Sequence, residues 1–289
     1  MTTTLNENKI VKSYPHASEH SHIALGQIHH RIELVKFWDI RLGERVLEIG
    51  CGQGDCTVVL ASAVGEEVGI LMEDPLGSPF TLGQAHDFIS ASPLGRRIDF
   101  VQADPATFLT SSDHSLEKYS VAVIAHCIWY FSSPSVLDQL LTSLAKSVQR
   151  ICIAEYALTA SDPKSIPHVL ATLTQASVEC HKPISKSNIR TVLSPSSIKA
   201  SALAASLTLE KETKITPNEG MFDGRWECGA VLRKGYRDEI DENVTDEREK
   251  AVILAMQDSV RSNLELLTAK GENVRTMDVW MAVFSKGTI

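Results

Sequence analysis

Residues 44–54 read Glu-Arg-Val-Leu-Glu-Ile-Gly-Cys-Gly-Gln-Gly, and this stretch decides the fold. The apolar run over residues 46–49 predicts a β-strand, and three glycines follow it at alternate positions, Gly50, Gly52 and Gly54. The next residues predict a helix. Because glycine lacks a side chain, a bound molecule can lie directly against the main chain of such a loop. The stretch therefore predicts a ligand site between a strand and a helix.

The residue after the loop narrows the choice of ligand. The dinucleotide fingerprint G-x-G-x-x-G needs a third glycine at position 55, where this chain has Asp55. A phosphate-binding loop needs Gly-Lys-Ser or Gly-Lys-Thr, which the sequence lacks. The remaining pattern is an acidic residue, Glu48, followed by Gly-x-Gly-x-Gly. This pattern disfavours a nicotinamide oxidoreductase.

The rest of the chain alternates between strands and helices. A helix with one apolar stripe is predicted over residues 21–38. Strands are predicted over residues 45–49, 67–72, 98–103, 121–125 and 151–155, with helices between them. Such alternation predicts an α/β fold with a parallel sheet covered by helices on both faces. Sheets of this kind bind ligands at the carboxyl ends of their strands.

Over roughly residues 40–156 the sequence resembles the class I S-adenosylmethionine-dependent methyltransferases, with a weaker likeness at the C-terminus. It is most similar in type to the ubiquinone/menaquinone-biosynthesis-like methyltransferase domain, which acts on small molecules. The resemblance implies a Rossmann-like, seven-stranded, mostly parallel sheet with an antiparallel seventh strand. Residues 207–215 and 277–284 supply candidates for the last two strands. S-adenosyl-L-methionine is the cofactor that this resemblance implies.

The resemblance also suggests how the chain is divided. Residues 1–40 are expected to form an N-terminal lid helix, and residues 41–289 the methyltransferase domain. Helical insertions are expected at about 157–206 and 217–273. A long amphipathic helix over 246–267 lies in the second insertion. We expect the lid helix and the second insertion to cover the substrate.

Several residues are carried over from the family as cofactor contacts. After the second strand, Glu73 or Asp74 is expected to hold the ribose, unless the pair only forms a solvated turn. After the third strand, Asp104 is expected to bind the adenine beside Ala103, unless it caps the next helix. The loop residues expected to contact the cofactor are Glu48, Gly50, Cys51, Gly52, Gln53 and Gly54.

The end of the fourth strand faces the methyl-transfer site in this family, and His126 stands there. A neutral imidazole can take a proton from the nucleophile, so His126 is a candidate base as well as a cofactor contact. Helix capping or cofactor packing is the alternative. His29 is a second candidate base, on a helix face opposite the apolar stripe. Trp129 and Tyr130 are candidate walls for the substrate, or else core residues.

Two further groups of residues are candidates for binding a substrate or a metal ion. Arg225 and Trp226 are substrate candidates because a Trp beside an Arg can stack on a flat or anionic molecule; anchoring the lid is the alternative. His16 and His20 are four residues apart, but Pro15 disfavours the helix that would bring them together. We therefore predict no metal site.

Composition restricts the partners. The formal net charge of −8 disfavours nucleic acid and anionic membranes, both of which need a basic surface. The six cysteines form no Cys-x-x-Cys pair, which is typical of reduced thiols and a cytoplasmic location. A small-molecule substrate is expected. The sequence does not decide whether the chain forms a homodimer.

The expected reaction is in-line transfer of a methyl group to an O, N, S or C nucleophile of a small metabolite. Two alternatives keep the same fold. One is a cyclisation or rearrangement without methyl transfer, and the other is a catalytically silent cofactor-binding subunit. Analysis of the product distinguishes a cyclisation or rearrangement from methyl transfer. A catalytically silent subunit would bind the cofactor but show no turnover.

Overall fold

The computed structural model describes residues 5–15, 21–65, 68–72, 81–103, 108, 119–185 and 187–287. Its strands are β1 (Val46–Ile49), β2 (Val68–Met72), β3 (Ile98–Gln102), β4 (Val121–Ala125), β5 (Arg150–Tyr156), β6 (Leu207–Ile215) and β7 (Val279–Lys286). Its α-helices are α1 (Glu7–Ser13), α2 (Ser21–Trp38), α3 (Asp55–Val64), α4 (Leu82–Ser90), α6 (Pro134–Ser147), α7 (Ile166–Glu179), α8 (Pro195–Ala204), α9 (Asp223–Leu232), α10 (Tyr236–Asn243) and α11 (Glu247–Ala269). Short 3₁₀ helices are η2 (Gly95–Arg97), η4 (Ile128–Tyr130) and η5 (Pro163–Ser165).

The described strands form one sheet in the order β3-β2-β1-β4-β5-β7-β6. β1 pairs in parallel with β2 and β4, so Ile49 at its end lies level with Leu71 and Ile124. β7 runs antiparallel to both β5 and β6. The predicted α/β class is confirmed, and the carboxyl ends of the central parallel strands meet at one edge of the sheet.

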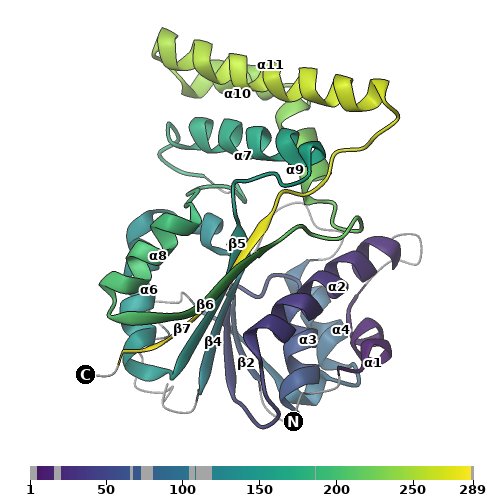
Figure 1. Ribbon diagram of the computed structural model, residues 1–289, viewed down its shortest axis with the longest axis vertical. Helices are drawn as coiled ribbons and strands as arrows, with labels where there is room; N and C mark the ends of the chain where they lie inside the picture. The colour runs from purple at the N-terminus through teal and green to yellow at the C-terminus, as the bar shows by residue number, and fades with distance from the viewer. Residues whose placement is uncertain are drawn as a thin grey trace.

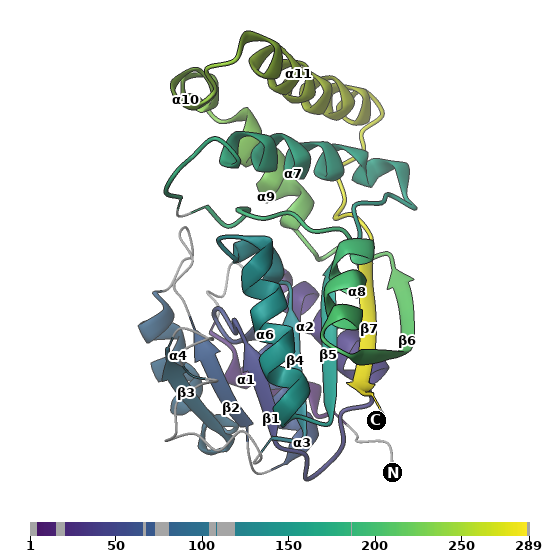
Figure 2. The ribbon, with the colours of Figure 1, turned by 90° about the vertical axis from the view of Figure 1, so that its left-hand side faces the viewer.

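The two faces of the sheet alternate along each strand, as side chains in a strand must. Val46 belongs to a core cluster shared with α1–α4, whereas Leu47 and Ile49 belong to a second cluster shared with α6 and α8. Figure 2 shows α6 and α8 in front of the sheet, with α2 and α3 behind it. These strands are buried on both faces, which explains their nearly continuous apolar sequences.

A separate helical layer lies beyond the carboxyl ends of the parallel strands and consists of α7, α9, α10 and α11, here called the cap (Figure 1). It has its own core, which includes Val178, Val231, Ile240, Ile253 and Val260. α8 departs from the expected first insertion, because its buried residues Ile198 and Ala202 pack in the second core cluster of the sheet. The cap is therefore built from residues on both sides of β6.

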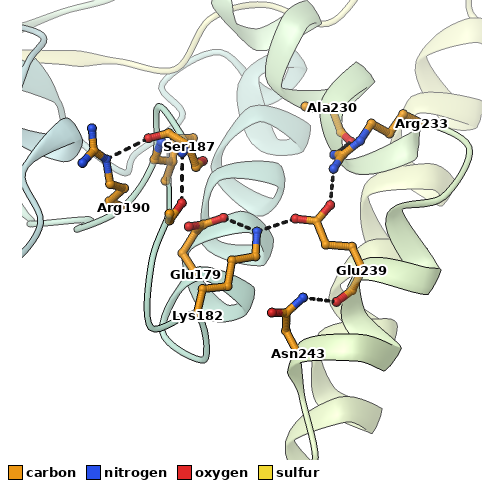
Figure 3. Close-up of polar contacts among 10 residues, drawn as sticks. Glu179, Lys182, Ser187, Arg190, Ala230, Arg233, Glu239 and Asn243 are labelled. Atoms are coloured by element: carbon orange, nitrogen blue, oxygen red, sulfur yellow. Dashed lines mark hydrogen bonds and ion pairs between the residues drawn. The ribbon is translucent and has the colours of Figure 1, made fainter. Parts of the chain in front are cut away.

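A network of charged groups ties the elements of the cap together (Figure 3). Lys182 donates to the carboxylate of Glu179, 2.6 Å away, and also to Glu239 on α10, which pairs with Arg233. The loop after it returns to the sheet, where the Arg190 N–H donates to the Trp129 carbonyl over 2.8 Å. The cap is thus linked to the loop that follows β4.

A buried carboxylate, Asp278, fixes the cap relative to the sheet. It accepts hydrogen bonds from the hydroxyls of Thr159 at 2.7 Å, Ser161 at 2.8 Å and Thr216 at 3.1 Å. These residues come from the connections that follow β5 and β6, while Asp278 itself precedes β7. In the part of the chain that the structure describes, no helix is both long and apolar enough to cross a bilayer.

Candidate active site

The glycine loop folds as its sequence requires. Gly50, Gly52 and Gly54 have φ values of 69°, 53° and 87°, a region that side chains disfavour. A Cβ at Gly50 would lie 2.7 Å from the Cβ of Cys127, and one at Gly54 would lie 2.4 Å from the Cδ1 of Ile89. A Cβ at Gly52 would meet no described atom within 4 Å. Gly50 and Gly54 therefore serve packing, whereas Gly52 leaves open space above the loop.

The side chain of Glu48 contacts α3 and is enclosed by the protein. Its carboxylate accepts a 2.7 Å hydrogen bond from the Thr57 hydroxyl on α3, and the side chain is buried. Burial raises the pKa of Glu48 to about 7. On the other side, His86 of α4 lies with its Nε2 atom 3.1 Å from the Gly52 carbonyl. These contacts hold the loop in shape from both sides.

Only some of the other predicted cofactor contacts can be placed. Cys51 is buried, and burial raises the pKa of its thiol, so its main chain is the part available to a ligand. Gln53 is half-buried in the loop, and Ala103 packs at the edge of the second core cluster. Glu73, Asp74 and Asp104 lie outside the described residues, as do His16 and His20.

Arg31 of α2 is a buried cation beside the loop. Its Nη2 atom lies 2.8 Å from the Oδ2 of Asp55, the first residue of α3. Its Nε and Nη1 atoms are also buried and have no hydrogen-bond partner among the described residues. Unpaired buried N–H groups of a guanidinium are costly, so they indicate an anionic ligand or water at this position.

His126 directly follows β4 and has a φ of 52°, which turns the chain at the sheet edge. Its Nε2 atom lies 3.0 Å from the Nε2 atom of His30 on α2. Burial, together with the nearby charge of Arg31, lowers the pKa of His126 to about 3 and also lowers that of His30. Both imidazoles are therefore neutral at neutral pH.

Glu155, next to the end of β5, contacts the turn that contains His126. Its Oε2 accepts the Ile128 N–H and its Oε1 accepts the Tyr156 N–H, both over 3.0 Å. Oε1 also lies 3.6 Å from the Nδ1 atom of His126. Burial raises the pKa of Glu155 to about 7, even though these N–H groups favour the charged form.

The cap contributes two carboxylates to the cluster. Asp223 accepts a 2.7 Å hydrogen bond from the Tyr156 hydroxyl and a 3.2 Å bond from the Gln27 amide. One turn further along α9, Glu227 accepts a 2.6 Å bond from Gln175, and burial raises its pKa to about 6. Carboxylates from α9, imidazoles from α2 and from the turn after β4, and the Tyr156 ring from β5 thus gather at the carboxyl edge of the sheet.

The two aromatic candidates after β4 have different environments. Trp129 is buried, donates its indole N–H to the Leu193 carbonyl over 3.1 Å, and packs with its ring centroid 5.2 Å from that of Tyr156. This placement favours an anchoring role. Tyr130 is half-buried, and burial followed by the charges of Glu227 and Asp223 raises the pKa of its hydroxyl. Tyr130 therefore lies near both cap carboxylates.

Three predicted site residues face away from this cluster. His29 is 48% exposed and lies 2.9 Å from Glu7, apart from the groups around His126. Its role as a base stays a prediction. α2 is buried over a wide arc, and its exposed side is the one that carries His29. Arg225 and Trp226 lie on the exposed side of α9, and the Trp226 ring centroid is 6.4 Å from that of Phe222. They do not reach the groups around His126.

The sequence reasoning missed His30, Arg31, Glu155 and Asp223. A signal existed for the first two, because they stand between Ile28 and Ile32, two residues of the apolar side of the helix. Among the described residues, no group of three or more His, Cys, Asp or Glu side chains is arranged to hold a metal ion. All six cysteines are free thiols.

Comparisons with known proteins indicate the class of the protein. The chain is 27% identical to the methyltransferase phomM of Diaporthe leptostromiformis, over 97% of this chain and 90% of the relative. A second methyltransferase of that organism, phomM′, is 26% identical over the same shares of the two chains. No family model matches the sequence.

The fold has a match among solved structures. A cyclopropane-fatty-acyl-phospholipid synthase-like protein from Lactobacillus casei superposes with a TM-score of 0.81 at 23% identity, over 96% of this chain and 98% of the other. The expectation of a class I S-adenosylmethionine-dependent methyltransferase is confirmed. The sequence likeness to methyltransferases supports the class, and the superposition supports the fold.

Proposed function

We propose that the chain transfers a methyl group from S-adenosyl-L-methionine to an O, N, S or C nucleophile of a small metabolite, by in-line displacement. The observation that carries this proposal lies at the glycine loop: a Cβ at Gly52 would meet no described atom within 4 Å, and Arg31, which pairs with Asp55 just after the loop, keeps two buried N–H groups without a partner among the described residues. A ligand with a flexible chain ending in a carboxylate fits both features. The methionine part of the cofactor is such a chain.

The residues present fit the cofactor at its amino-acid end. The bare main chain at Gly52 would lie against it, and the Nε and Nη1 atoms of Arg31 would donate to its carboxylate. Glu73 or Asp74 for the ribose and Asp104 for the adenine stay predictions. When bound, the cofactor supplies a methyl group on a positively charged sulfur.

The protein's own contribution is mainly positioning. The cap closes the carboxyl edge of the sheet, which keeps water from the reacting groups. Holding a nucleophile in line with the methyl carbon can supply roughly 7–11 kcal/mol of barrier reduction. His126 is neutral at neutral pH because its pKa is lowered to about 3, so it can hold or pass a proton. The cap carboxylates Asp223 and Glu227 would bound the substrate.

The proposal is tested by following the methyl group. Purified protein is incubated with S-adenosylmethionine labelled with ¹³C at the methyl carbon and a small-molecule extract, and the mixture is analysed by mass spectrometry. We expect a labelled small molecule together with S-adenosylhomocysteine. A changed product without label would favour cyclisation or rearrangement. Cofactor binding without any turnover would favour a silent binding subunit.

A further inference from the structure

The pair of imidazoles between α2 and β4 has a direction that can be worked out. His30 and His126 are both buried and neutral, and their Nε2 atoms are 3.0 Å apart. A neutral imidazole carries one N–H and one lone pair, so one of these Nε2 atoms donates and the other accepts. The proton on each ring is then fixed, because a ring that accepts at Nε2 must carry its proton on Nδ1.

Glu155 decides which ring donates. Each of its oxygens already accepts a main-chain N–H, from Ile128 and Tyr156, which favours the ionised carboxylate. Oε1 lies 3.6 Å from His126 Nδ1, which is longer than a hydrogen bond, and His126 Nδ1 has no other hydrogen-bond partner among the described residues. An N–H at that position is attracted to the carboxylate, whereas a lone pair is repelled. His126 therefore carries its proton on Nδ1 and accepts at Nε2.

The consequence falls on His30. Its Nε2 must donate to His126, so its Nδ1 is left as a bare lone pair. This atom is buried and has no hydrogen-bond partner among the described residues. An acceptor buried without a donor usually indicates a ligand or water that supplies one.

We propose that His30, His126 and Glu155 form a directed proton relay, in which Nδ1 of His30 takes the proton of the substrate nucleophile. The Nε2 proton of His30 then passes to Nε2 of His126, and the Nδ1 proton of His126 passes to the Glu155 carboxylate. The nucleophile loses one proton and Glu155 gains it, so no charge is left on either imidazole. This inference rests on the proposed methyl transfer.

The relay also defines the class of substrate. Its nucleophile must carry a proton that it gives up, as a hydroxyl, a thiol or an N–H group does. Carbon–carbon double bonds and thioethers have no such proton and would not need the relay. The acceptor at its far end is suitable, because the pKa of Glu155 is raised to about 7 and the carboxyl can both take and release a proton near neutral pH.

The direction is measured without a substrate. Long-range ¹H–¹⁵N correlation spectra of the ¹⁵N-labelled protein report which nitrogen of each histidine carries the proton. We expect Nε2–H on His30 and Nδ1–H on His126 at about pH 8.5, where Glu155 is ionised because its pKa is about 7. His168 is an internal reference, because its Nδ1 accepts the Met277 N–H over 3.0 Å and so its proton must be on Nε2. Nε2–H on His126, or a charged ring at either position, would overturn the relay.

A single variant should remove the preference of the pair. Glu155→Leu is similar in size but leaves no carboxylate near Nδ1 of His126, which lies 3.6 Å from it in the wild type. The fraction of His126 that carries its proton on Nδ1 should fall, and the fraction of His30 that carries its proton on Nε2 should fall with it. The state of His168 should not change. If both site histidines keep their protons in this variant, and circular dichroism shows it folded, Glu155 does not set the direction and the relay is wrong.

Activity gives an independent readout that also separates the two proposals. In an assay that follows S-adenosylhomocysteine formation, His30→Gln should lower kcat by about 10²–10⁴-fold, the usual contribution of a general base. Its affinity for S-adenosylhomocysteine should stay within about threefold of wild type. Unchanged kcat would overturn the relay and leave the proposed function standing. If the wild-type protein did not bind S-adenosylhomocysteine at all, the proposed function would be refuted instead.

Discussion

Replacing Arg31 by Gln tests the amino-acid end of the cofactor site. The change removes a buried guanidinium that has two unpaired N–H groups, and a hydrogen bond to a charged group is worth about 1.5–3 kcal/mol. Since about 1.4 kcal/mol corresponds to a tenfold change, Kd for S-adenosylhomocysteine should rise about 10- to 100-fold. Isothermal titration calorimetry measures this change directly.

The matched ligand is 5′-methylthioadenosine, which keeps the nucleoside and sulfur but lacks the amino-acid carboxylate. Arg31→Gln should change its Kd by less than about threefold, so the ratio of the two Kd values isolates the carboxylate contact. Asp55→Asn is the matched control variant, because it removes the partner of Arg31 at 2.8 Å and keeps the guanidinium. Equal weakening of both ligands by Arg31→Gln, or of neither, would refute the assignment.

Two further predictions concern stability. Burial lowers the pKa of His168 to about 3, so between about pH 3 and 6.5 the unfolded chain holds one proton more at this ring. The stabilisation of the folded state by the neutral His168 ring is complete above pH 6.5 and falls by about 1.4 kcal/mol per pH unit on acidification. In urea titrations, His168→Gln should therefore lower the slope of the unfolding free energy against pH by this amount. An unchanged slope would refute the assignment. Trp129→Ala should lower the free energy of unfolding by about 3–5 kcal/mol. Trp226→Ala, at a side chain that is 49% exposed, should change it by less than about 0.5 kcal/mol, and similar losses would contradict their placement.

The strand-and-loop framework could be predicted because it depends on local chemistry. Gly50, Gly52 and Gly54 all adopt the positive φ that only glycine accepts readily, and the alternating pattern of elements fixes the sheet. The sequence did not show which of these glycines is needed for packing and which leaves room for a ligand. Cys127 and Ile89 explain two of the glycines by packing, and these contacts come from distant parts of the chain.

Helix faces were harder to predict. One residue step turns a side chain by about 100° around a helix, so His29 lies at the surface while His30, the next residue, lies beside His126. α11 shows the same difference between adjacent residues, because Val252 is 60% exposed while its neighbour Ile253 is buried. A wide buried arc, as in α2, hides the distinction because apolar residues then occur on most sides.

The contacts of Glu155 and Asp223 could not be foreseen for a different reason. Each meets partners from elements far away in sequence: Asp223 bonds Tyr156 and Gln27, and Glu155 bonds the turn after β4. Such contacts depend on how the cap rests on the sheet. Neither periodicity nor motif spacing contains that information.

The central claim is that a sulfonium cofactor lies against the main chain at Gly52. Titration of S-adenosylhomocysteine into the wild-type protein and into Gly52→Val, under identical calorimetric conditions, tests it most directly. The account predicts one site per chain in the wild type and no measurable binding in the variant, provided that circular dichroism shows the variant folded. Equal binding by the two proteins, or no heat from the wild type, would contradict it.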